Sequence, residues 1–137
     1  MILSTPEGPV AAGPDAMEFQ VDIWLRGTDV ATTRSITSLS AGPSAWTDQD
    51  VATLLREMLS AIYRAKNPNV GPDIQVFLRG FSWIVNPFED KGVVVAIEIQ
   101  AGAAVSGPFQ IEKQRLEEMI SRAIALGKAS AAPPSVH

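Results

Sequence analysis

Residues 18–27 read Glu18-Phe19-Gln20-Val21-Asp22-Ile23-Trp24-Leu25-Arg26-Gly27. Every second side chain in this stretch is apolar, and these positions are Phe19, Val21, Ile23 and Leu25. This two-residue period is typical of a β-strand with one face turned toward a core. Asp22, Trp24 and Arg26 must then share the opposite face of the strand. A strand buried on one side needs a covering layer, so the stretch predicts a sheet packed against helices.

The clearest helix follows Thr47. Thr47 and Asp50 are spaced as in a capping box, in which each side chain bonds the other residue's backbone N–H. Apolar residues then recur at helical spacing, and they are Val51, Leu54, Leu55, Met58, Leu59 and Ile62. The dipeptide Asn67-Pro68 ends the pattern. We therefore expect an amphipathic helix from Thr47 to about Asn67.

The remaining elements complete the order ββαββα. Threonine and isoleucine favour a second strand over 31–40, and strands are expected over 73–85 and 93–101. The turn-forming loop 86–92 should join the last two strands as a hairpin. A second amphipathic helix is expected over 110–126. Its predicted inward residues are Leu116, Met119, Ile120 and Ala123.

Together these elements predict an α+β fold, a two-layer sandwich with a mainly antiparallel sheet of four to five strands and both helices on one face. Val21–Gly27 resembles Ile74–Gly80, and Leu55–Ser60 resembles Leu116–Ser121. An internal ββα duplication is one interpretation of this likeness. Chance convergence of amphipathic segments is the other.

Length and composition indicate one domain. The chain has 137 residues, 46% of them hydrophobic, and the proline- and glycine-containing ends 1–16 and 128–137 resemble solvated tails around a domain at 17–127. The formal net charge is −4 and the basic residues form no run, so nucleic acid is not expected as a partner. No signal peptide or membrane-spanning stretch is visible, which indicates a small soluble protein in the cytoplasm.

Few residues offer catalytic chemistry. The chain has no cysteine, and its one histidine is the last residue, His137. The absence of cysteine excludes thiolate nucleophiles and metal–cysteine sites, and a single terminal histidine gives no support for a histidine-based triad. There is no glycine-rich phosphate loop either. We expect no cofactor, no metal and no catalytic residue.

The strongest candidate site is the sheet face opposite the helices. Alternation places Trp24 and Arg26 there with Phe77 and Arg79, and Trp83 joins them if the strand register continues past Gly80. Exposed tryptophan and arginine are typical of interface hot spots. The competing interpretation is that the arginines pair internally with Asp22 or Glu98 and the aromatic rings pack across strands.

These features favour a non-enzymatic protein-binding or adaptor domain that self-associates through its open sheet face, with a homodimer expected. An alternative is a cofactor-independent enzyme or small-ligand carrier. Its pocket would be lined by tryptophan or phenylalanine, an arginine, and the carboxylate of Asp22 or Glu98. A flat exposed face supports partner binding, whereas convergence of these side chains around a cavity supports the pocket.

Overall fold

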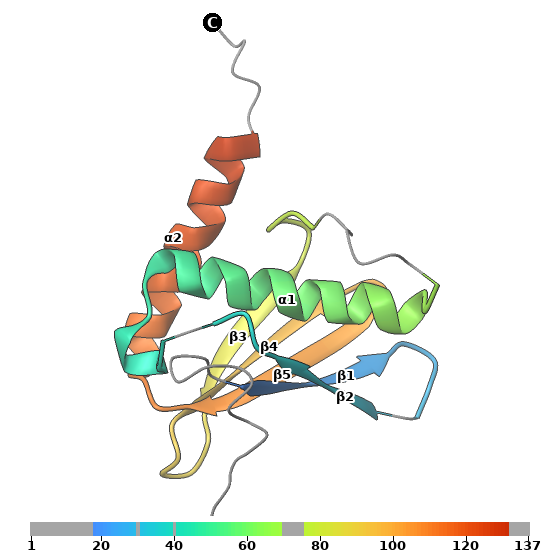
Figure 1. Cartoon of the computed structure of the whole chain (residues 1–137), viewed down its shortest axis with the longest axis horizontal. Coiled ribbons are helices and arrows are strands. Elements are labelled where there is room, and N and C mark those ends of the chain that lie inside the picture. The colour runs from blue at the N-terminus through green and yellow to red at the C-terminus, as the bar shows by residue number, and fades with distance from the viewer. Residues whose placement is uncertain (1–17, 30, 40, 70–75, 132–137) are drawn as a thin grey trace, which may run out of the picture.

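The computed structural model describes residues 18–131 except positions 30, 40 and 70–75. It contains one five-stranded antiparallel sheet and two long helices, which confirms the α+β class (Figure 1). The strands are β1 (Phe19–Leu25), β2 (Ala31–Ile36), β3 (Ser82–Pro87), β4 (Val93–Ile99) and β5 (Gly102–Phe109). The helices are α1 (Asp48–Lys66) and α2 (Lys113–Ala131), with a short 3-10 turn, η2, at Pro43–Ala45.

Strand β5 holds the two halves of the sheet together. The strand order is β2-β1-β5-β4-β3, so β5 pairs on one side with β1 and on the other with β4. Only glycine fits at position 102 of this strand, because a Cβ atom there would lie 2.2 Å from the carbonyl oxygen of Trp24. The first hairpin and the β3-β4-β5 meander therefore form one continuous sheet.

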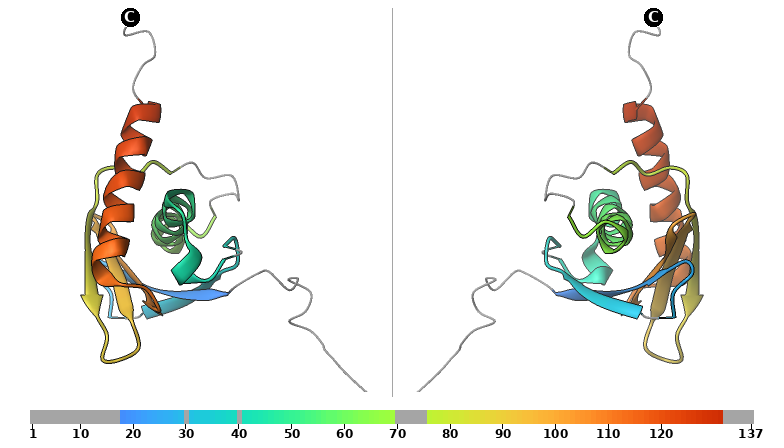
Figure 2. Two further views of the ribbon diagram at one scale, coloured as in Figure 1. Left: turned by 90° about the vertical axis from the view of Figure 1, so that its left-hand side faces the viewer. Right: turned by 90° about the vertical axis from the view of Figure 1, so that its right-hand side faces the viewer.

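Both helices pack on the same face of this sheet, as expected (Figure 2). Helix α1 contacts β1, β2 and β5, whereas α2 contacts β3 and α1. The expected capping box is present, with Asp50 N donating to the Thr47 hydroxyl and Thr47 N donating to the Asp50 carboxylate. The predicted apolar stripes of both helices are buried in one core.

An aromatic cluster closes one end of the core. The rings of Phe19, Trp46 and Phe109 meet edge to face, with centroids 4.9 to 5.6 Å apart. Trp46 is 2% exposed, and its indole N–H donates to the carbonyl oxygen of Ala41 at 3.0 Å, so its polar atom is satisfied inside the fold. This cluster ties β1 and β5 to the segment that leads into α1.

Two arginines of α2 bond to η2 and to the first residue of α1. Arg115 donates to the carbonyl oxygen of Ser44 at 2.9 Å, and Arg122 lies 3.0 Å from the carboxylate of Asp48. The hydrogen bond with Asp48 raises the pKa of Arg122 above its ordinary value.

The second half of the chain differs from the sequence-based expectation in two ways. It holds one strand more, because β5 was not predicted as a separate strand. In addition, the expected strand over 73–85 begins only at Ser82, and residues 76–81 form a loop. The segment 74–80 therefore has no strand in its described part, and this removes the element that was aligned with β1 in the proposed duplication.

The chain ends fall mostly outside the described residues. The expected N-terminal tail, 1–16, lies there entirely, as does the end of the expected C-terminal tail. Helix α2 continues to Ala131, five residues beyond the predicted end at 126. Within the described part of the chain, no helix is both long and apolar enough to cross a membrane.

Candidate functional site

The face of the sheet opposite the helices carries an apolar band. Strand register brings Trp24 of β1 opposite Ala103 of β5, and Val105 of β5 opposite Ala96 of β4, which in turn lies opposite Ile84 of β3. We call this surface the outer band, and its members are Trp24, Ala103, Val105, Val94, Ala96 and Ile84.

Burial confirms that these residues point away from the core. Ile23, Ala104 and Ile97, which alternate with them along the strands, are at most 1% exposed. By contrast, Trp24 is 41% exposed and Ile84 is 52% exposed. Side chains on successive strand positions point to opposite faces, so the outer band is the uncovered face of the same sheet whose other side forms the core.

The side chains at the two ends of the outer band are large, and those at its centre are small. Trp24 and Ile84 are large, whereas the members of the band on β5 and β4 are alanines and valines, all half-buried. Glu98 of β4 lies on the same face, opposite Ala103. No described helix packs on this side of the sheet. The result is a shallow apolar surface that extends over four adjacent strands.

Charges of both signs border the band. The Arg26 guanidinium lies 3.0 Å from the Glu98 carboxylate and also donates through Nε to the carbonyl oxygen of Gln100 at 2.9 Å. Asp22 accepts a hydrogen bond of 2.7 Å from the Thr33 hydroxyl. The internal pairing of Arg26 that the sequence left open is therefore present, and it holds its charges next to Trp24.

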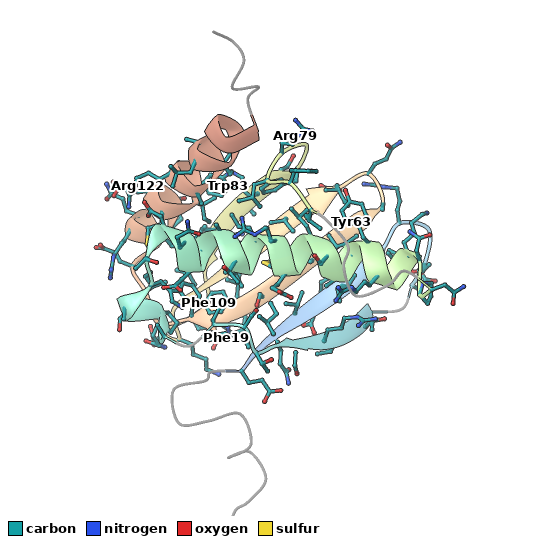
Figure 3. All side chains as sticks on the ribbon, turned by 45° about the horizontal axis from the view of Figure 1, so that its top comes forward. Phe19, Tyr63, Arg79, Trp83, Phe109 and Arg122 are labelled. Atoms are coloured by element: carbon teal, nitrogen blue, oxygen red, sulfur yellow. The ribbon has the colours of Figure 1, made fainter. Side chains whose placement is uncertain are left out.

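Three of the predicted site residues lie elsewhere. Phe77 and Arg79 belong to the loop before β3, where the Arg79 guanidinium lies 5.3 Å from the centre of the Phe77 ring. Trp83 is opposite Ile97, on the helix side of the sheet, where it packs half-buried against the core (Figure 3). The expectation that these residues share a face with Trp24 and Arg26 was wrong.

Phe77 and Arg79 are misplaced because their segment is a loop, whereas for Trp83 the reason is a break in strand phase at Gly80. This residue has φ of 73°, a left-handed conformation that interrupts an extended chain, and β3 starts two positions later. A shift of one residue moves a side chain to the other face of a sheet. Ile84 therefore occupies the outer position that was assigned to its neighbour Trp83. Its apolar character was visible in the sequence, but the strand phase that exposes it was not.

Two pockets among the described residues lie away from the outer band. One, of about 520 Å³, is open and lies where the end of α1 approaches the β4–β5 turn; it is lined by Tyr63, Lys66, Gly80, Ile99, Gln100 and Ala101. The other, of about 180 Å³, lies between α1 and β2. Neither of these two pockets is lined by Asp22 or Glu98, the carboxylates expected in an alternative pocket.

Comparisons with known proteins do not assign a family: no family model, no curated protein and no solved structure matches the chain. Within the described ranges, no group of three or more acidic or histidine side chains is placed to hold a metal ion. The outer band is thus the site that the geometry defines most clearly.

Proposed function

We propose that this protein is a non-enzymatic binding domain that self-associates through the outer band as a homodimer. The observation that carries the proposal is the pair of large apolar side chains, Trp24 and Ile84, exposed on a sheet face that no described helix covers. Contiguous apolar surface of this kind marks interaction sites in soluble proteins. Tryptophan is also among the residues most enriched at energetic hot spots.

A second copy fits the shape of the surface. In a dimer with twofold symmetry, each chain contributes the same patch, so the patch must complement itself. The large side chain at one end of the outer band can pack over the alanines and valines at the centre of the partner's band. Arg26 and the carboxylates Asp22 and Glu98 lie near the same end of the band, so each copy offers both signs of charge to the other.

The pocket-based alternatives have less support. Trp24 and Trp83 lie on opposite faces of the sheet, and Phe77 lies in a loop, so the aromatic side chains do not converge on one cavity. Glu98 is 60% exposed and bonded to Arg26. A carboxylate that acts as a general base in a pocket is expected instead to be desolvated.

The test is sedimentation velocity over a concentration series that extends to high micromolar. We expect the unaltered chain to dimerise, and we expect Trp24→Ala combined with Ile84→Ser to shift it to monomer while the circular dichroism spectrum stays unchanged. Phe77→Ala is the matched control, because Phe77 is an aromatic residue with 53% exposure outside the outer band. This variant should dimerise normally.

A carboxylate placed at the centre of the band gives an independent check. Ala96→Glu leaves the core side of β4 untouched but brings a like charge into a symmetric contact, which should abolish the dimer. An unaltered chain that is monomeric throughout the series, or a dimer that withstands both Ala96→Glu and the double substitution, would rule out self-association through this face.

A further inference from the structure

Strand β2 lies at one edge of the sheet, and no described strand pairs with its free edge. It pairs with β1 and with no other described strand, and five of its six residues are exposed. The opposite edge of the sheet, β3, ends in Pro87, which has no N–H to donate, and α2 packs against that strand. Helix α1 contacts β2, but the sequence of this strand, Ala-Thr-Thr-Arg-Ser-Ile, contains no proline, so every residue of the edge keeps its backbone N–H.

The hydrogen bonds along β1 and at the residue that follows it identify which backbone groups of β2 point away from β1. Arg26 N donates to Ala101 O and the Ser106 hydroxyl donates to Gln20 O, so the even-numbered residues of β1 direct their backbone groups toward β5. By alternation, the odd-numbered residues of β1 face β2. Their partners across the ladder are Ile36, Arg34 and Thr32.

The remaining residues of β2 therefore point their backbone N–H and C=O groups away from the sheet. These residues are Ala31, Thr33 and Ser35, and none of them makes a backbone hydrogen bond outside the β1 ladder to any described residue. The hydroxyls of Thr33 and Ser35 donate to the carboxylates of Asp22 and Glu18, so they do not occupy the backbone groups of the edge. The edge thus offers donors and acceptors at the two-residue spacing that an additional strand requires.

A groove runs beside this edge. The pocket of about 180 Å³ between β2 and α1 is lined by Val21, Arg34, Ser35, Ile36, Glu57, Ala61 and Arg64. Three of these lining residues, Val21, Ile36 and Ala61, are apolar, and three, Arg34, Arg64 and Glu57, are charged. The guanidinium of Arg34, on the helix side of β2, makes no hydrogen bond or ion pair with any described residue.

We propose that the β2 edge and this groove bind an extended acidic peptide segment, which adds to the sheet as a sixth strand. The peptide backbone pairs with Thr33 and Ser35, and its side chains on the helix side enter the groove, where an apolar residue meets Ala61 and a carboxylate meets Arg34. Strand addition of this kind takes affinity from backbone hydrogen bonds and specificity from pockets for alternate side chains.

Charge decides between a peptide and a second copy at this edge. The β2 strand of a second copy carries no carboxylate and brings another Arg34, so it leaves the guanidinium without a partner. An acidic segment supplies that partner in a charge-assisted hydrogen bond. The site is separate from the outer band, because the edge is recognised through backbone groups and the groove lies on the helix side of the sheet.

The probe is a short dye-labelled peptide in which every second residue is threonine and the residues between are glutamates and valines. Fluorescence anisotropy measures its binding. A peptide with lysine in place of glutamate is the charge control. We expect the glutamate peptide to bind the unaltered chain and the lysine peptide to bind at least about tenfold more weakly, since opposite charges at a contact set specificity. Arg34→Glu should reverse this preference.

Thr33→Pro should weaken binding of the glutamate peptide by about tenfold as well, because the substitution removes a backbone N–H that points away from the β1 ladder. Arg79→Glu changes the net charge as Arg34→Glu does, but in a distant loop, and should bind as the unaltered chain does. Trp24→Ala should also leave peptide binding intact. Because Trp24 lies in the outer band and not at the β2 edge, this last variant tests peptide binding independently of dimerisation.

If Thr33→Pro does not fold, as judged by circular dichroism, the charge reversal at Arg34 decides alone. Equal binding of both peptides, no binding of either, or an unchanged preference in Arg34→Glu would refute the proposal. Loss of self-association in Arg34→Glu, without any peptide binding to the unaltered chain, would assign the edge to a second copy instead.

Discussion

The guanidinium of Arg26 and the carboxylate of Glu98 lie 3.0 Å apart, although the two residues are 72 positions apart in the sequence. Arg26 directly follows β1 and Glu98 lies in β4, and these strands are not neighbours: β5 runs between them, and Ala103 lies opposite both Trp24 and Glu98. The ion pair thus reaches across a small side chain and keeps two opposite charges beside an exposed tryptophan.

Removal of this ion pair should change folding stability little. The two side chains are 61% and 60% exposed, and exposed pairs contribute about 0–1 kcal/mol because water and salt screen them. We expect Arg26→Ala to lower the free energy of unfolding by less than about 1 kcal/mol in urea titrations. A larger loss would mean that the pair organises the sheet rather than its surface.

Leu59 should contribute far more to stability. It is 1% exposed in the stripe by which α1 faces the core, and truncation of such a leucine costs about 2–5 kcal/mol through lost transfer energy and a cavity. Leu126 of α2 is 53% exposed and serves as the matched control. Chemical denaturation should show a large loss for Leu59→Ala and a small one for Leu126→Ala, and similar losses would contradict the assigned burial.

Gly102 should not tolerate even a methyl group. A Cβ atom at this position would lie 2.2 Å from the Trp24 carbonyl oxygen, a backbone atom that cannot rotate away. Overpacking typically costs about 1–3 kcal/mol, and we expect Gly102→Ala to reach at least that range. Thermal unfolding provides the measurement. A melting temperature equal to that of the unaltered chain would show that β1 and β5 are farther apart than the structure has them.

The start of α1 should depend on the Thr47 hydroxyl. This group accepts the hydrogen bond from Asp50 N, and loss of such a cap costs about 0.5–2 kcal/mol. Thr47→Ala should therefore destabilise the fold by that amount. Thr37→Ala is a control at an exposed position outside any helix or strand. If both variants unfold at the same urea concentration, the capping box does not stabilise the helix.

The candidate site was only partly readable from the sequence. The alternation in β1 correctly put Asp22, Trp24 and Arg26 on one face, since the pattern runs without interruption along a single strand. Phe77 and Arg79 were assigned to the same face because a strand was expected over 73–85, but residues 76–81 form a loop. Trp83 was assigned to it by carrying the alternation through Gly80. The left-handed turn there resets the strand phase, and pairing with β4 then fixes the phase of β3.

The sequence by itself determined the elements whose signals are local. Helix α1 has its cap, its apolar stripe and its stop within one continuous stretch, and β1 has an unbroken two-residue period, so both were predicted closely. Only the tertiary structure decided that Gly102–Phe109 is a strand, because its glycines, alanines and proline have weak strand preference and are held extended by β1 and β4 on either side. Register likewise decided that Ile84 is exposed on the outer face while its neighbour Trp83 faces the helices. Register is a property of two paired strands, and neither strand's own sequence contains it.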